Sequence, residues 1–242
     1  MKIIKLNTYE FIEVTDNKKF NLIWHTCPFN LAFRCKKPIK GSGIYFISIN
    51  NEVVYIGKYQ SQTGNIITDR WLKHLTTISA RGYRIGFRSE SIIGKLNAVA
   101  GNAEFKDILN IAHRKNLRYK LFRDTGHTTS VNRVRFISDN WSVFKKLKCD
   151  DFLDLFELHF IALQSKGNVK KINGLISGLE LSVLQQVKPV CNKEFDYKIN
   201  SKNRRQNRPR LITKIIMREI DSIPGLTANY HVVLKSISKH DE

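Results

Sequence analysis

The sequence predicts an α+β fold in which a small antiparallel sheet, opening with a β-hairpin, is flanked by helices. Two neighbouring runs rich in β-branched and aromatic residues, GIYFISI and EVVYIG, are joined by Asn50-Asn51, which favours a hairpin turn. Several later segments repeat apolar residues at helical spacing. Because 42% of the 242 residues are hydrophobic and 26% charged, as in ordinary globular proteins, we expect one folded domain.

Residues 1–41 precede the hairpin and are expected to form an N-terminal arm. Short apolar runs alternate there with polar breaks, and Pro28 and Pro38 argue against a long regular element. After the hairpin, the segment ITDRWLKHLTTI places its apolar residues at helical spacing. It predicts an amphipathic helix, with Asn65 or Thr68 as its N-terminal cap.

The remaining chain is expected to contain more helices and two basic stretches. Between residues 81 and 123, ten basic residues face only three acidic ones, and the stretch 198–210 holds six basic residues and no acid. Helical spacing or composition predicts helices over 103–116, 150–164, 179–187 and 211–220, and a strand over 117–123. Within the helix predicted over 150–164, His159 is expected to be a core residue.

The charge balance points to a polyanionic partner. The 41 Lys and Arg residues against 21 Asp and Glu residues give a formal net charge of +20. The basic residues are spread along the chain, no apolar stretch is long enough to cross a membrane, and no signal peptide is recognisable at the start. We therefore expect a cytoplasmic protein that binds nucleic acid and no membrane. The four cysteines form no metal-binding or disulfide pattern and are expected to be reduced.

The hairpin carries Gly43-Ile44-Tyr45 and Tyr55-Ile56-Gly57, and the segment RWLKH follows on the next predicted helix. This arrangement resembles the GIY-YIG nuclease family, whose name is these two tripeptides and whose essential arginine lies on the helix after the hairpin. The resemblance makes Tyr45, Tyr55, Arg70 and His74 candidate catalytic residues. Arg70 and His74 are four residues apart, which places both on one face of a regular helix.

The family also has a metal-binding glutamate on a later helix, commonly followed by a proline and an asparagine. Glu180, Pro189 and Asn192 resemble that run, which implies that Glu180 binds the metal and that Asn192 completes the site. Since 105 residues separate His74 from Glu180, the resemblance requires a long insertion, and Glu157 is a rival ligand.

On this reading the catalytic core comprises 42–80 and 151–195, the inserted DNA-binding region is 81–150, and 196–242 is a basic C-terminal extension.

The residue types suit phosphodiester hydrolysis, which needs an activated water and neutralisation of the charge that develops on the phosphate. One carboxylate can hold one Mg²⁺ or Mn²⁺ ion that keeps most of its waters. The resemblance implies that Arg70 binds the phosphate and that Tyr45 activates the water, although the two tyrosines can exchange roles. The residues expected to contact DNA are Lys58, Arg81, Arg84, Arg88, Arg204, Arg205 and Arg208.

The size and layout favour a type II restriction endonuclease that cuts a specific site in double-stranded DNA, with no nucleotide cofactor. One site cuts one strand, so double-strand cleavage implies a homodimer or larger homo-oligomer. Two alternatives remain: a phage or mobile-element, homing-like endonuclease of relaxed specificity, and a nucleic-acid-binding module that has lost catalysis.

Overall fold

The structure, a computed structural model, describes residues 3–15, 33–78, 98, 100–114, 131–165, 169–192 and 207–234. The chain divides into two compact units. The first comprises Met1–Glu13, Arg34–Trp71 and Leu153–Glu242, and the second comprises Val14–Phe33 and Leu72–Phe152. The second unit takes in the segment 81–150, which the sequence analysis treats as an insertion within a single domain.

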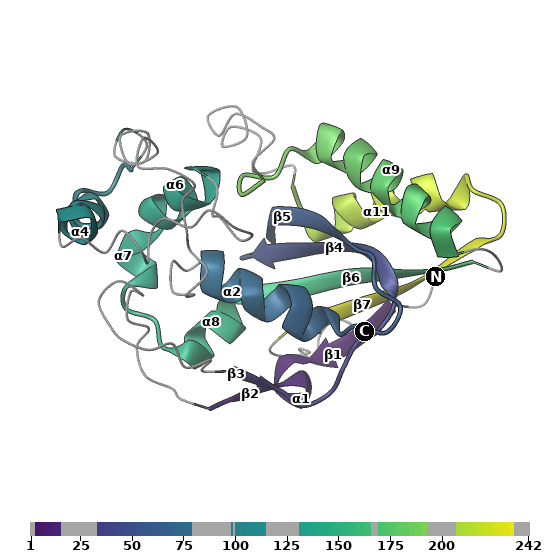
Figure 1. Ribbon diagram of the computed structural model, residues 1–242, viewed down its shortest axis with the longest axis horizontal. Helices are drawn as coiled ribbons and strands as arrows, with labels where there is room; N and C mark the ends of the chain where they lie inside the picture. The colour runs from purple at the N-terminus through teal and green to yellow at the C-terminus, as the bar shows by residue number, and fades with distance from the viewer. Residues whose placement is uncertain are drawn as a thin grey trace. The chain divides into compact units, whose positions relative to one another are not determined.

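The first unit is built on a five-stranded sheet in the order β1-β7-β6-β4-β5 (Figure 1). Its strands are β1 (Ile3–Asn7), β4 (Ser42–Ile49), β5 (Glu52–Tyr59), β6 (Phe156–Ser165) and β7 (Leu226–Leu234). The sheet is larger than predicted and is mixed, because β1 pairs with β7 in parallel while the other pairs are antiparallel. Strands from the predicted arm and from the predicted C-terminal extension are therefore integral to the sheet.

The predicted β-hairpin is confirmed as β4 and β5. Asn50 and Asn51 connect the strands with φ angles of 49° and 61°, so both turn residues have the left-handed conformation. Two consecutive positive φ angles are the mark of a type I′ turn, whose twist matches that of the flanking strands. Asparagine tolerates this conformation better than other residues that carry a Cβ atom, and this explains why the pair predicted the turn.

The helix predicted over 150–164 is wrong in its second half. Helix α8 (Cys149–Leu155) ends one residue before β6, which is the central strand of the sheet between β4 and β7. Residues Phe156, Leu158, Phe160 and Ile161 are buried on both faces of the sheet, so the strand shows no alternation of apolar and polar residues. A continuous apolar run of this length fits a buried helix equally well.

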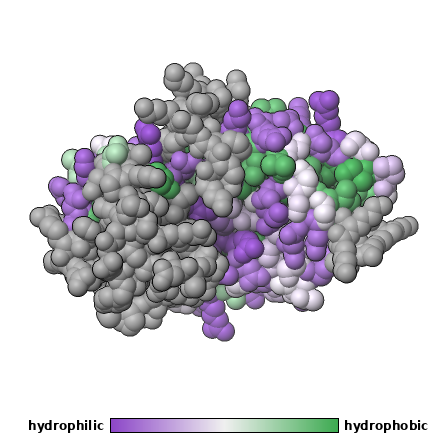
Figure 2. All heavy atoms as spheres, turned by 45° about the horizontal axis from the view of Figure 1, so that its top comes forward, coloured by the Kyte–Doolittle hydropathy of each residue, from purple (hydrophilic) through white to green (hydrophobic). Residues whose placement is uncertain are grey.

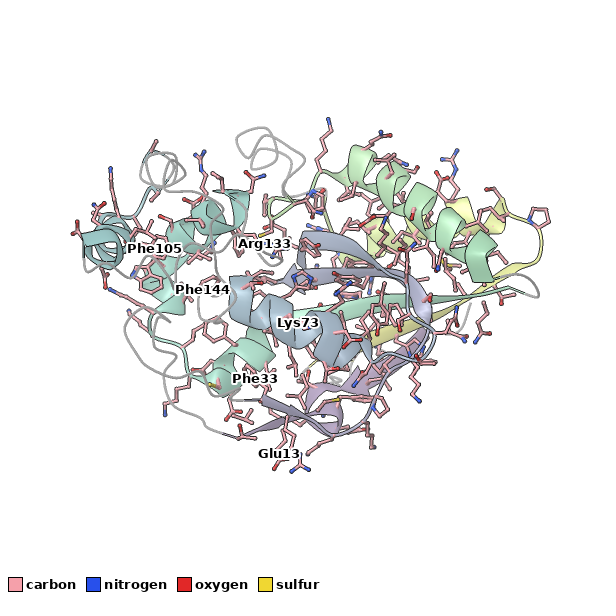
Figure 3. The ribbon with its side chains drawn as sticks, in the orientation of Figure 1. Glu13, Phe33, Lys73, Phe105, Arg133 and Phe144 are labelled. Atoms are coloured by element: carbon pink, nitrogen blue, oxygen red, sulfur yellow. The ribbon has the colours of Figure 1, made fainter. Side chains whose placement is uncertain are left out.

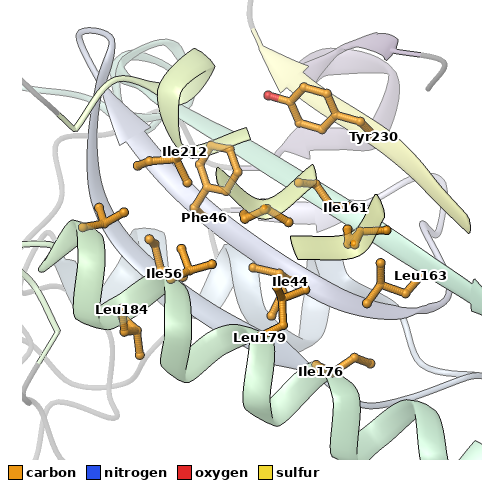
Figure 4. Close-up of a cluster of buried hydrophobic side chains, with 14 of the residues drawn as sticks. Ile44, Phe46, Ile56, Ile161, Leu163, Ile176, Leu179, Leu184, Ile212 and Tyr230 are labelled. Atoms are coloured by element: carbon orange, nitrogen blue, oxygen red, sulfur yellow. The ribbon is translucent and has the colours of Figure 1, made fainter. Parts of the chain in front are cut away.

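One face of the sheet is covered by α9 (Val169–Val187) and α11 (Pro209–Asp221), which contact each other and the strands. We call this the helix face. Figure 4 shows its core, in which Ile44, Phe46 and Ile161 of the sheet meet Ile176 and Ile212 of the helices. The opposite face, which carries Tyr45, is called the tyrosine face. The helices predicted over 179–187 and 211–220 are thus confirmed, and α9 begins earlier than predicted.

The second unit is mainly helical in its described part. It contains α2 (Leu72–Ile78), α4 (Ala103–Arg114), α6 (Val131–Asp139), α7 (Trp141–Phe144) and the start of α8. Aromatic rings form its core: the centroids of Phe105 and Trp141 are 5.1 Å apart, and those of Phe144 and Phe152 are 5.6 Å apart. Figure 3 labels Phe105 on α4 and Phe144 on α7. The helix predicted over 103–116 is confirmed by α4, and the strand predicted over 117–123 lies outside the described residues.

The remaining elements are short. They are α1 (Thr8–Phe11), β2 (Ile12–Val14), β3 (Phe33–Cys35) and the π-helical turn η1 (Ile67–Trp71). Strands β2 and β3 pair as a separate two-stranded sheet. Within the described part of the chain, no helix has the length and apolar character needed to span a membrane.

Candidate functional site

Tyr45 and Tyr55 lie on the same face of the hairpin. Tyr45 pairs with Gly57 across β4 and β5, and Tyr55 pairs with Ile47. Because directly opposed residues share a face and alternate residues along a strand return to it, both tyrosines and Gly57 point the same way. The two ring centroids are 6.0 Å apart with the planes tilted by 39°. The sequence reasoning therefore placed the two tyrosines together correctly.

Gly57 is the floor on which the two rings meet. A Cβ atom at this position would lie 2.8 Å from both Cζ and Oη of Tyr45 and 3.0 Å from Cε1 of Tyr55. These separations are shorter than van der Waals contact, so any side chain at this position would have to push the tyrosine rings away. The glycine of the second tripeptide thus has a direct steric role in this arrangement.

Tyr59 adds a third tyrosine to the same face, and it brings Arg70 with it. The guanidinium carbon of Arg70 is 5.7 Å from the centroid of the Tyr59 ring, within the range of a cation–π contact. Tyr59 Oη donates a 2.5 Å hydrogen bond to Asp69 Oδ2. Burial, reinforced by this bond, raises the pKa of Tyr59 to about 12. Sequence reasoning missed Tyr59, although strand alternation from Tyr55 and Gly57 already placed it on this face.

Glu180 reaches the edge of β5 from helix α9. Its Oε1 accepts a 3.1 Å hydrogen bond from the backbone N–H of Lys58, the residue directly after Gly57. Its Oε2 lies 3.4 Å from Lys58 Nζ, which also donates to Ser177 Oγ at 3.1 Å. The carboxylate is therefore one residue along the strand from the glycine that supports the tyrosines. Ser177, another residue that sequence reasoning missed, precedes Glu180 by one helical turn.

Asn192 completes the outer edge of β5, which has no neighbouring strand in the five-stranded sheet. Its side-chain Oδ1 accepts from Ile56 N–H at 3.0 Å, and its Nδ2 donates to Ile56 C=O at 2.8 Å. Cys191 N–H donates to Val54 C=O at 2.9 Å. The asparagine amide thus acts as a one-residue substitute for a strand, and it holds the segment between Tyr55 and Gly57 in place.

The carboxylate of Glu180 can accommodate one divalent cation. A carboxylate offers about four lone-pair directions, and Lys58 occupies one on each oxygen. Mg²⁺ is commonly held by one or two carboxylates and keeps several waters, so a cluster of ligands is not required. No group of three or more His, Cys, Asp or Glu residues that could hold a metal occurs among the described residues. An incoming cation would compete with the Lys58 ammonium for the carboxylate.

Arg70 and His74 lie on either side of a change in structure. Asn65 Oδ1 accepts from Ile67 N–H at 3.1 Å, so Asn65 caps this segment, as predicted. Arg70 lies in the π-helical turn η1 of the first unit, whereas His74 is a buried residue of α2 in the second. The one-face argument for these two residues assumed a regular α-helix, and it stays a prediction. A π-helical turn interrupts many functional helices.

Glu157, the rival metal ligand, is engaged in a buried polar cluster on the helix face. Glu157 Oε2 accepts from Ser48 Oγ at 2.7 Å and lies 3.1 Å from His159 Nε2. His159 Nδ1 is 2.7 Å from Tyr230 Oη. Burial lowers the pKa of His159, so a neutral ring that donates through Nε2 and accepts from Tyr230 satisfies the cluster. The hydrogen bond from His159 lowers the pKa of Glu157.

This cluster separates Glu157 from the tyrosines, because residues 157 and 159 of β6 pair with Ser48 and Phe46 of β4 and not with Tyr45. His159 is a core residue, as predicted, although on a strand. Of the predicted DNA contacts, Lys58 is paired with Glu180, and Arg208 is exposed directly before α11. Arg81, Arg84, Arg88, Arg204 and Arg205 lie outside the described residues.

The structure therefore brings Tyr45, Tyr55 and Arg70 to one sheet face, with Glu180 and Asn192 bound to the adjacent edge strand. Comparison with known proteins adds nothing to this arrangement: the chain matches no protein-family model, no curated protein and no solved structure.

Proposed function

We propose that this chain is a metal-dependent DNA endonuclease of the GIY-YIG type, acting as a type II restriction enzyme on double-stranded DNA. The observation that carries the proposal is the convergence of Tyr45 and Tyr55 on Gly57, directly before the residue whose amide binds Glu180. The tripeptides alone are short enough to occur by chance. A carboxylate from a residue more than 120 positions away, bound beside them, is a much more specific feature.

In this proposal Glu180 holds one Mg²⁺ or Mn²⁺ ion, which neutralises charge on the phosphate during hydrolysis. Arg70 donates hydrogen bonds to a phosphate oxygen, and its contact with Tyr59 keeps the guanidinium on the tyrosine face. One tyrosine accepts the proton of the attacking water as the phosphorus–oxygen bond to the leaving group breaks. Asn192 keeps Ile56, between Tyr55 and Gly57, at a fixed position.

The two tyrosines differ in access to substrate. Only 2% of the surface of Tyr45 is exposed, whereas Tyr55 is half-buried. Resemblance assigns the base to Tyr45, but its burial requires the bound phosphate to reach a hydroxyl group that is nearly closed off from solvent. The comparison of Tyr45→Phe with Tyr55→Phe decides the assignment: the variant that loses more of kcat lacks the base, while a loss confined to binding marks the orienting residue.

The proposal is tested with Glu180→Ala and a matched control, Glu13→Ala, which removes an exposed carboxylate from β2. We expect wild type and the control to cut plasmid DNA with Mg²⁺ and to stop when EDTA is added. Glu180→Ala should bind the same DNA but not cut it. Cleavage by Glu180→Ala at the wild-type rate would refute the proposed metal site.

A nucleic-acid-binding module without catalysis is the second candidate, and one contact favours it. Lys58 already provides Glu180 with a counter-ion, as expected if the carboxylate serves only to position a strand edge. Both candidates predict DNA binding that weakens with salt. They differ in cleavage: a module without catalysis would leave plasmid DNA intact with Mg²⁺ and with Mn²⁺. If both strands are cut, a second copy of the chain is required.

A further inference from the structure

Helix α11 carries a row of exposed cations that the site does not use. Arg210, Lys214 and Arg218 are exposed and follow each other at intervals of four residues, on the side of the helix opposite Ile212 and Ile216. At 1.5 Å per residue, the row spans about 12 Å. Figure 2 is turned so that the part of the molecule holding α9 and α11 comes forward, and hydrophilic side chains dominate its described surface.

The row is unfavourable to the folded helix itself. Like charges four residues apart on a helix repel each other, and the row contains two such pairs. Arg210 also lies in the first turn of α11, where the partial positive charge of the helix end disfavours a cation. Asp221 follows Arg218 by three residues, yet within the described ranges no ion pair joins any of the three cations to an acid. An external polyanion would remove this repulsion.

The row cannot contact the phosphate that reacts at the candidate site. Ile212, Ile216 and Ile220 bury the inner side of α11 against the helix face of the sheet, and Tyr45 and Tyr55 occupy the other face. The sheet therefore separates the α11 row from the tyrosines. Any nucleic acid bound by the row belongs to a different stretch of the polymer from the one at the site.

We propose that Arg210, Lys214 and Arg218 bind the phosphate backbone of a second stretch of duplex DNA, apart from the stretch at the tyrosines. The choice of polymer rests on the proposed function. Phosphates recur every 3.4 Å of helix axis along each DNA strand, so a straight row of about 12 Å can meet about three of them. Only one exposed apolar side chain, Leu211, accompanies the row in the described part of α11, and this is too little for an amphipathic membrane anchor.

The test compares two variants that lose the same charge. In one, Arg210, Lys214 and Arg218 are replaced by Gln; in the control, the exposed Arg34, Lys36 and Lys40 are replaced by Gln. The affinity for a 60-base-pair duplex is measured at several salt concentrations in EDTA, so that cleavage does not interfere. We expect the slope of log affinity against log salt to fall by about 2.7 in the α11 variant, or 0.9 per phosphate, and to stay near the wild-type slope in the control.

Equal slopes for the two variants would overturn the proposal, because the effect would then be one of net charge. A charge-conserving variant, Arg210→Lys with Lys214→Arg and Arg218→Lys, should keep the wild-type slope and shows that folding is not the cause. Loss of binding to phosphatidylserine vesicles with an unchanged slope on DNA would also overturn it. A chain that binds DNA through α11 but never cuts it would contradict the proposed nuclease function while supporting this surface.

Discussion

Replacing Gly57 with alanine tests the packing on which the candidate site depends. The new Cβ atom would lie 2.8 Å from the Tyr45 hydroxyl oxygen and ring carbon, so the ring must move by roughly 0.6 Å to regain ordinary contact. Tyr45 is buried and has little room to move, and overpacking of this kind costs about 1–3 kcal/mol. A shift of about this size at a reacting group lowers the rate by roughly 10- to 100-fold.

The assay is a double-mutant cycle measured by urea unfolding. Gly57→Ala should destabilise the protein by about 1–3 kcal/mol when Tyr45 is present. In a Tyr45→Ala background the obstructing ring is gone, and the same substitution should cost about zero. The coupling free energy between the two positions is therefore expected to be about 1–3 kcal/mol. It reports on the packing whether or not the protein is a nuclease.

Gly178→Ala is the matched control, since a Cβ atom there would meet nothing within 4 Å and the residue lies inside helix α9. This change should stabilise the protein by about 1 kcal/mol, the ordinary gain from replacing glycine in a helix. The reasoning about Gly57 would be refuted if Gly57→Ala cost the same free energy with and without the Tyr45 ring.

Three further predictions concern the surroundings of the hairpin. Asn192→Ala should lower the free energy of unfolding by about 1–3 kcal/mol for each Ile56 backbone group left without its partner, measured by urea unfolding against Asn192→Asp, which keeps the acceptor. Tyr59, with a pKa of about 12 against 10 in the unfolded chain, should stabilise the fold fully below pH 10 and lose this contribution as pH rises toward 12. Tyr59→Phe should remove one late-titrating phenol from the absorbance titration. Lys58→Met should lower the Mg²⁺ concentration for half-maximal cleavage about fivefold, because the ammonium 3.4 Å from Glu180 opposes a second cation.

Each of these has a contrary outcome. Equal stability of Asn192→Ala and wild type would show that water replaces the amide at the strand edge. Titration of every tyrosine near pH 10 would contradict the burial and the Asp69 bond of Tyr59. An unchanged or higher Mg²⁺ requirement in Lys58→Met would place the metal away from Glu180.

The hairpin was predictable from sequence because its signals are local. Asn50 and Asn51 adopt the left-handed conformation that their residue type tolerates, and the flanking runs have the composition of strands. Asn65 likewise caps the next segment through a bond to a residue two positions on. In both cases the determining contact lies within a few residues, so one sequence is sufficient to find it.

The errors arose where distant segments decide the structure. The run from Phe156 to Ser165 becomes a strand because β4 and β7 flank it, and its apolar pattern alone cannot show that. Strand β1 lies in a segment interpreted as an arm, and β7 in one interpreted as an extension, since their partners are far away in the chain. The contact of Glu180 with Lys58 was implied only by resemblance, because it joins residues on different elements.

The most direct test of the central claim is the sequencing of DNA ends after incubation of the wild-type chain with plasmid DNA and Mg²⁺. The proposed function predicts Mg²⁺-dependent breaks whose ends share one short sequence, and neither EDTA-treated samples nor Glu180→Ala should produce them. Intact plasmid with both Mg²⁺ and Mn²⁺ would contradict the nuclease assignment, and breaks at unrelated sequences would contradict the restriction role.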